Sequence, residues 1–298
     1  MFFNDRPPQY TGQVASDLIK DILMSEKPCM ISRFGSTELN CIHTYKNKNK
    51  NLIVRQVKYI KGNIDSFEWS GDIKHSMSNN AGFFPTLDKK LEDFSKLMIK
   101  EMKNVDILGS WLFQENYFNK ELKNVKKVHL EDLVPFNHKN PWSYALKGKV
   151  ILVVHPFDES INSQYQRKDL LFKNKQVLPD FKLITYRPVQ SFLGNHENLE
   201  YKDWFEALEK MKEDISRLEF DIAIIGCGAY GFPLASFIKR IGKKSIHMGG
   251  ATQLLFGVLG KRWEQEYDLS NFINEYWIRP NLNEKPKNFQ NVENGCYW

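Results

Sequence analysis

The segment SRFGSTE, residues 32–38, combines a cation, a glycine and a carboxylate where a short apolar run ends. Arg33 can form a forked hydrogen bond with a phosphate, because its guanidinium presents parallel N–H donors. Gly35 and Ser36 stand at the expected start of a helix, where backbone N–H groups attract anions. Glu38 could hold a divalent metal that neutralises a diphosphate, or could only stabilise the first helical turn. The segment therefore predicts an anion-binding pocket and leaves the role of Glu38 open.

A second segment, HPFDES at residues 155–160, places a histidine and two carboxylates directly after a strongly apolar run. Transfer of a group to a hydroxyl needs a base within hydrogen-bond reach of that hydroxyl. Asp158 or Glu159 could supply this base, and His155 could bind phosphate or polarise the hydroxyl. The alternative is that the two carboxylates and Ser160 only cap the helix that follows. We therefore treat His155, Asp158 and Glu159 as candidate catalytic residues.

A third segment, residues 218–250, has the form strand, glycine turn, helix, strand. Gly226, Gly228 and Gly231 give the pattern G-x-G-x-x-G directly after an apolar run. Such a turn can bring backbone N–H groups to an anionic ligand, and Tyr230 lies within it. The pattern predicts that Gly226, Gly228 and Tyr230 line a ligand site, although the glycines could also serve only close packing.

This glycine pattern is typical of dinucleotide-binding oxidoreductases, but one part is missing. Such a site needs an Asp or Glu roughly 20 residues further on, where it binds the ribose hydroxyls. The second strand instead reads Ser245, Ile246, His247, Met248. An NAD(P)-dependent oxidoreductase thus stays an alternative, and a phosphate or sugar ligand fits the residues better.

The elements that must position these residues alternate between strand and helix. We expect strands at 29–32, 52–60, 105–109, 125–130, 149–155, 181–186, 220–225 and 245–248. We expect helices at 15–24, 38–45, 87–103, 113–122, 160–172, 201–218 and 232–241, and a short one after Pro141. This order predicts an α/β fold with a mostly parallel, Rossmann-like sheet covered by helices on both faces.

The chain divides into two α/β halves in this interpretation. Residues 1–140 carry the RFGSTE segment, and residues 141–298 carry HPFDES and the glycine turn. We expect one compact unit with a central cleft, because ligands of such sheets bind beyond the carboxyl ends of the strands. The residues that follow strands there are Arg33 to Glu38, Gly109 to Trp111, His155 to Glu159 and Gly226 to Tyr230. The aromatic tail from Trp263 is expected to wrap the surface.

Composition sets further bounds on this chain of 298 residues. Its 42 Lys and Arg against 36 Asp and Glu give a net charge of +6 without a basic stripe, so we expect no nucleic-acid partner. The four cysteines contain no C-x-x-C pair, which argues against structural zinc. No signal peptide and no membrane-spanning run is apparent. We expect a cytoplasmic protein with at most peripheral membrane association.

Several segments together resemble the GT-D-type glycosyltransferases. They are ISRFGSTELN, NNAGFFP, DILGSW and the long glycine segment, and they span residues 28–256 loosely. The resemblance implies a Rossmann-like fold and an R-F-G-D-x-E type motif that serves the nucleotide-sugar diphosphate and its metal. In this chain the motif reads RFGSTE, with Ser36 at its first acidic position. Only Glu38 carries over as a metal ligand, so dependence on Mn²⁺ or Mg²⁺ is an open expectation.

The resemblance implies a hexosyltransferase that moves a sugar from a nucleotide-sugar donor to a glycan or glycolipid acceptor. The expected setting is synthesis of a surface polysaccharide, such as a capsule or lipopolysaccharide, in the cytoplasm or at the inner face of the membrane. A non-catalytic nucleotide- or sugar-binding protein is a further alternative. The residues leave open the donor, the acceptor, the stereochemical outcome and the oligomeric state.

Overall fold

The computed structural model describes residues 8–48, 56, 68–192, 199–265, 268–286, 289–291 and 293–298. In this part of the chain, seven parallel strands form one sheet in the order β3-β2-β1-β7-β6-β4-β5. The strands are β1 (Cys29–Ser32), β2 (Ile107–Ser110), β3 (Lys126–His129), β4 (Val150–Val154), β5 (Lys182–Tyr186), β6 (Ile222–Ile225) and β7 (Lys244–His247). The predicted parallel α/β sheet is confirmed.

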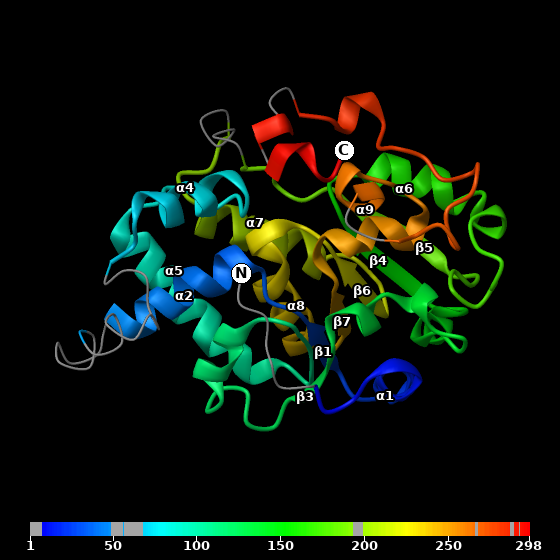
Figure 1. Cartoon of the computed structure of the whole chain (residues 1–298), viewed down its shortest axis with the longest axis horizontal. Coiled ribbons are helices and arrows are strands. Elements are labelled where there is room, and N and C mark those ends of the chain that lie inside the picture. The colour runs from blue at the N-terminus through cyan, green and yellow to red at the C-terminus, as the bar shows by residue number, and fades with distance from the viewer. Residues whose placement is uncertain are drawn as a thin grey trace.

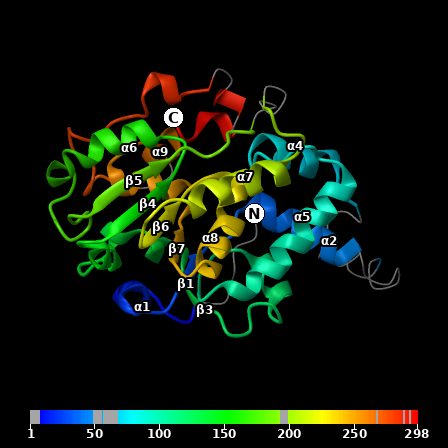
Figure 2. The same ribbon diagram turned by 180° about the vertical axis from the view of Figure 1, so that it is seen from behind.

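Helices cover both faces of the sheet, as the alternating pattern predicts. One face carries α1 (Gly12–Met24), η5 (Trp142–Leu146), α6 (Asp158–Tyr165) and η9 (Gly249–Phe256). The other carries α2 (Ser36–Lys48), α4 (Gly71–Asn79), α5 (Asp88–Glu101), α7 (Trp204–Ser216) and α8 (Gly231–Arg240). Figures 1 and 2 show α2 and α5 side by side at one end of the molecule, and α6 beside α9 (Lys261–Gln265) at the other.

Alternate residues of each strand supply the two cores. Ile151 and Val153 of β4 belong to one core, and Leu152 and Val154 belong to the other. All four side chains are fully buried. Strands of a parallel sheet are covered on both faces, so they are apolar at successive positions and do not alternate with polar residues. This explains why KVILVVH reads as a continuous apolar run.

The strand–helix–strand unit predicted around the glycine turn is present. β6 leads through η8 (Gly228–Tyr230) into α8, and β7 returns parallel to β6. β7 then pairs with β1, so the strands of the two halves form one continuous sheet. The chain leaves β1 into α2 on one face of the sheet and leaves β7 into η9 on the other. Adjacent strands whose connections leave to opposite faces open a crevice at their carboxyl ends.

Some predicted elements differ from the structure. The strand expected at 52–60 lies outside the described residues except for Gln56, which is helical. The helix expected at 113–122 is a 3-10 helix, η2 (Phe113–Phe118). The carboxylate of Glu115 accepts the N–H groups of Trp111 and Leu112 at 2.9 and 3.0 Å, which holds the start of η2 against the end of β2. Helix α4 was not expected from its polar sequence.

The remaining short helices lie in the connections and in the tail. They are η1 (Met102–Asn104), η3 (Leu130–Leu133), η4 (Pro135–Asn137), η6 (Lys168–Leu170), η10 (Leu282–Glu284), η11 (Phe289–Asn291) and η12 (Glu293–Gly295). Among the described residues, no helix combines the length and the apolar character needed to cross a bilayer.

Candidate functional site

A cavity of about 700 Å³ opens at the carboxyl edge of the sheet, where β1 meets β7. Each of the four strand-end segments singled out from the sequence contributes to its lining. Representative lining residues are Arg33, Ser110, His155 and Gly226, which follow or end β1, β2, β4 and β6. The parallel order of the strands brings these ends to the same edge. Segments far apart in the sequence thereby form one site.

Arg33 and Glu38 both line this cavity. The guanidinium of Arg33 lies over the ring of Trp111, with 5.0 Å between its carbon and the ring centroid. Trp111 is itself held by a 3.0 Å hydrogen bond from its indole N–H to the carbonyl of Phe34. A guanidinium stacked on a ring keeps its N–H donors at the edge, where they can bind an anion. The stacking therefore orients Arg33 toward the cavity.

Glu38 lies in the first turn of α2, and only 9% of its surface is exposed. Its carboxylate folds back against Gly35, so that a Cβ added there would stand 1.8 Å from Oε2. A side chain at position 35 would therefore displace the Glu38 carboxylate from this place. Ser36 and Thr37, which lie between Gly35 and Glu38 in the chain, also line the cavity. The RFGSTE segment therefore contributes one buried carboxylate and one cation to the cavity lining.

His155 is a buried neutral donor in this arrangement. Its Nδ1 accepts a 3.0 Å hydrogen bond from the N–H of Phe157, so the ring proton of the neutral form is on Nε2. Burial lowers the pKa of His155 to about 3. Because the lone pair of Nδ1 is already engaged, the ring can donate a hydrogen bond through Nε2 but is a poor base. Its predicted role in binding phosphate or a hydroxyl fits this geometry.

A second histidine, His247, lines the cavity and was not among the predicted site residues. Its Nδ1 is 3.1 Å from the hydroxyl of Ser32. Burial, followed by the charge of Arg33, lowers the pKa of His247 to about 3. His155 follows one short strand and His247 ends another, and this shared position is the signal that the sequence carries. Only His155 is followed by carboxylates, so the sequence pattern favours His155 alone.

Asp158 and Glu159 are placed differently from Glu38. The part of their segment that lines the cavity ends at Phe157. Asp158 and Glu159 accept hydrogen bonds from Arg187 at 2.5 and 2.9 Å. A hydrogen bond from Asn283, followed by that from Arg187, lowers the pKa of Glu159. The structure therefore does not bring these two carboxylates into the cavity with Arg33.

The helix that begins at Asp158 is capped from the C-terminal tail. The buried carboxylate of Glu284 accepts the N–H of Glu159 at 2.8 Å and also binds Ser160 through its N–H and hydroxyl groups. The capping function that the sequence offered for residues 158–160 is thus performed by a residue from the tail. Asp158 and Glu159 add negative charge to the first turn of α6, which is favourable there.

Each glycine of the G-x-G-x-x-G turn accommodates a close contact. A Cβ on Gly226 would lie 2.5 Å from the carbonyl oxygen of Gly249, and one on Gly231 would lie 2.4 Å from Nε2 of His247. Gly228 has a φ of +57°, and its Cβ would stand 2.9 Å from the carbonyl oxygen of Ala81. The glycines therefore allow tight packing, while Gly226 and Gly228 also line the cavity.

Tyr230 lines the cavity from within this turn. Its ring stacks on Trp204 with centroids 5.0 Å apart, and its hydroxyl lies 2.8 Å from that of Ser191. Burial raises the pKa of Tyr230. The side chain is thus largely part of the core, with one edge at the site.

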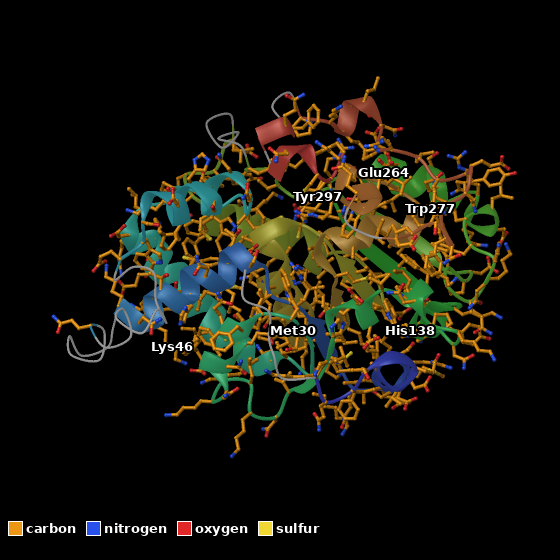
Figure 3. All side chains as sticks on the ribbon, viewed as in Figure 1. Met30, Lys46, His138, Glu264, Trp277 and Tyr297 are labelled. Atoms are coloured by element: carbon orange, nitrogen blue, oxygen red, sulfur yellow. The ribbon has the colours of Figure 1, made fainter. Side chains whose placement is uncertain are left out.

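The C-terminal tail, which was expected to wrap the surface, also forms a wall of the cavity. Trp277 and Trp298 are buried, and Tyr297 and Trp298 line the cavity. The carbonyl of Tyr297 accepts a 3.2 Å hydrogen bond from Gln253. Figure 3 shows Tyr297 near Glu264 of α9, at the side of the molecule where the tail lies. Tail residues missed by the prediction thus complete the site.

Whether a divalent metal fits this site depends on the side chains that could bind it. Among the described residues, no three His, Cys, Asp or Glu side chains come together as a metal-binding group. With Ser36 and Thr37 beside it, Glu38 supplies a single carboxylate, whereas protein sites for divalent ions commonly use several oxygen ligands. The described residues therefore supply one carboxylate, Glu38, that could help to hold a metal together with the phosphates of a substrate.

Comparison of the chain with models of protein families, with curated proteins and with solved structures finds no match.

Proposed function

We propose that this protein is a glycosyltransferase that transfers a sugar from a nucleotide-sugar donor to a glycan or glycolipid acceptor. The observation that carries the proposal is the convergence of Arg33, Glu38 and His155 in one cavity of about 700 Å³. Cavities that hold small molecules have volumes of about 300–1,000 Å³. The resemblance of the RFGSTE and glycine segments to GT-D-type enzymes supports the same reaction.

The leaving group of this reaction is a nucleoside diphosphate, and its charge rises as the sugar departs. Arg33 is the cation of the RFGSTE segment and would stabilise that charge. His155 would add a neutral N–H donor that needs no change of protonation. Preorganised donors of this kind act strongly in a buried site, because little solvent reorganises during the reaction.

Glu38 is the buried carboxylate that lines the cavity. In the proposed reaction it would accept the proton of the acceptor hydroxyl, which is the role first expected of Asp158 or Glu159. The resemblance instead implies that Glu38 binds a metal. Activity in the presence of EDTA would favour the base, and restoration by Mn²⁺ alone would favour the metal ligand.

The direct test is a panel of uridine, guanosine, thymidine, adenosine and cytidine nucleotide sugars. We expect one of them to raise the melting temperature and to release its nucleotide slowly even without an acceptor. Arg33→Gln and Glu38→Gln should weaken this release, whereas Arg217→Gln should not, because Arg217 is exposed and is not part of the cavity lining. If no member of the panel binds, the proposal is wrong.

The same panel separates the alternatives. Binding of a nucleotide sugar without release or transfer to any acceptor would indicate a non-catalytic binding protein. Quenching of protein fluorescence by NADH or NADPH would indicate an oxidoreductase. The proposed setting, surface polysaccharide synthesis in the cytoplasm or at the inner face of the membrane, is what the resemblance implies.

A further inference from the structure

The cavity is bordered by two helix starts that differ in how their backbone N–H groups are used. After β6, the chain enters η8 and α8, and the N–H of Ala229 donates to the carbonyl of Ala81 at 3.0 Å. Pro233 lies in the first turn of α8 and has no N–H. In the glycine turn that looks like a phosphate-binding loop, the N–H groups of Gly226, Ala229 and Gly231 are therefore already used within the protein.

After β7, the chain enters η9 without such obstacles. Gly249 and Gly250 are its first two residues, and both line the cavity. In a 3-10 helix the first bond runs from the third helical residue back to the residue before the helix. The N–H groups of Gly249 and Gly250 therefore have no partner within the helix. The positive end of η9 faces the site with two donors.

A cation lies directly beside this helix start. The nearest guanidinium nitrogen of Arg33 would be 3.3 Å from a Cβ added at Gly249, whose φ is +61°. Gly249 thus lets the guanidinium approach the backbone of η9 closely. Stacking on Trp111 orients the same guanidinium, at 5.0 Å from the ring centroid.

An independent observation points to the same place. His155 is only 3% exposed, its Nδ1 is bound to Phe157, and within the described part of the chain no hydrogen bond is formed by its Nε2. Its Cδ2, which is bonded to Nε2, and the carbonyl oxygen of Gly249 both lie within 3 Å of the position of a Cβ on Gly226. The Nε2 edge of His155 is therefore next to the start of η9. This N–H donor lines the cavity without a protein partner among the described residues, so the geometry suits an anionic acceptor.

We infer that the start of η9 binds a diphosphate group, through the N–H groups of Gly249 and Gly250, the guanidinium of Arg33 and the Nε2–H of His155. The inference places the phosphate site after β7 and away from the conspicuous turn after β6. It rests on the proposed function only for the identity of the diphosphate as that of a nucleotide. A prenyl diphosphate on a lipid carrier has the same anionic group.

The first experiment measures binding by isothermal titration of the whole chain with inorganic pyrophosphate, UDP, GDP and farnesyl diphosphate. Arg33→Gln should weaken pyrophosphate binding about 10- to 100-fold, because it removes a charged hydrogen bond. His155→Phe should weaken it about 3- to 10-fold, because it removes a neutral one. Arg217→Gln is the matched control and should leave affinity unchanged. Preference for UDP or GDP over farnesyl diphosphate identifies the nucleotide as the source of the group.

The second experiment locates the anion and does not depend on variants that could unfold. Selective ¹⁵N labelling of glycine reports on the 17 glycines of the chain. Pyrophosphate should shift the amide signals of Gly249 and Gly250 and leave that of Gly228 in place. A shift of the Gly228 signal without a shift of the Gly249 signal would overturn the inference. It would indicate that the anion binds at the turn after β6.

The two proposals fail in different ways. Pyrophosphate binding at Gly249 without turnover of any nucleotide sugar would support the anion site and contradict the proposed glycosyl transfer. Turnover that falls in Glu38→Gln but is unchanged in Arg33→Gln and His155→Phe would keep glycosyl transfer without a leaving-group role for Arg33 and His155, and would overturn the anion site.

Discussion

The turn after β6 and the turn after β7 lie next to each other at the same edge of the sheet, yet their glycines have different roles. Gly226, Gly228 and Gly231 admit the close approach of Gly249, Ala81 and His247. Gly249 and Gly250 start η9 beside Arg33 and line the cavity. The more conspicuous pattern thus serves packing to a large extent, and the plainer Gly-Gly pair has the geometry of an anion site. A motif has to be judged by what fills the space next to each glycine.

Gly226→Ala should give the largest effect, because it tests the packing role of the first turn. The new Cβ would stand 2.5 Å from the carbonyl oxygen of Gly249 and 2.9 Å from Cδ2 of His155. We expect the free energy of unfolding to fall by about 3 kcal/mol, since overpacking of a rigid site costs roughly that much. Urea denaturation followed by circular dichroism measures this change.

Gly71→Ala is the control for that substitution. Gly71 is the first residue of α4, and an added Cβ meets nothing within 4 Å. We expect no loss of stability there, or a gain of about 0.4–1 kcal/mol. Equal losses at Gly71 and Gly226 would contradict the packing role of the turn.

Glu38→Gln and Glu159→Gln compare the two carboxylate segments in catalysis. We expect kcat/KM for nucleotide-sugar turnover to fall about 100-fold, or about 2.7 kcal/mol, for Glu38→Gln. Glu159 is paired with Arg187 and Asn283 outside the cavity lining, so Glu159→Gln should change the rate less than about threefold. If Glu159→Gln lowers kcat/KM strongly and Glu38→Gln does not, the catalytic base is Glu159, in the turn after β4. Steady-state kinetics of both variants decides between them.

The two strand-end histidines predict how stability depends on pH. Their pKa values are lowered to about 3 in the folded protein, against about 6.5 in the unfolded chain. The unfolded state therefore binds more protons below pH 6.5, and stability is lost as the pH falls. Between pH 6.5 and 5, each histidine should remove about 2 kcal/mol from the free energy of unfolding.

Urea denaturation at pH 7, 6 and 5 measures this dependence. His247→Asn should show a smaller loss between pH 7 and 5 than the wild type, because one proton-linked group has been removed. Titration of the carboxylates is common to both proteins and cancels in the comparison. An identical pH dependence in the two proteins would mean that His247 is not buried and neutral.

Arg187→Gln should give the smallest effect. The side chain of Arg187 is 38% exposed and pairs with Asp158 and Glu159. Solvent screens such pairs, so we expect a loss of at most about 1 kcal/mol and unchanged turnover. A large loss of turnover would show that the ion pairs at the start of α6 act on the site. Thermal denaturation and the nucleotide-release assay test both expectations.

The sequence predicted the parts of the site that depend on local pattern. The strands before Arg33, His155 and Gly226 are apolar runs that end in polar or glycine residues, and such ends can be read directly. The pairing of β7 with β1 could not be predicted from local sequence pattern, because strand order depends on contacts between distant segments. The proximity of Arg33 to Gly249 follows from that pairing and was missed with it.

The tail shows a second limit of local pattern. Glu284 and Tyr297 come from a region without hydrophobic periodicity, so no element was predicted there. Glu284 caps α6, and Tyr297 forms a wall of the cavity. Both roles arise only when the tail packs onto the body of the molecule. Residues of irregular segments are therefore the ones that sequence reasoning is most prone to miss at a site.

The stacking of Arg33 on Trp111 has a practical consequence. Of the seven tryptophans in the chain, Trp111, Trp263 and Trp298 line the cavity, and Trp111 contacts the cation at 5.0 Å. Indole emission responds to a nearby charge, so neutralisation of Arg33 by a bound anion should alter the intrinsic fluorescence. The change should be lost in Trp111→Phe and retained in Trp142→Phe, whose indole is fully buried away from the site. The protein thus carries its own optical reporter for ligand screening without added dyes or labels.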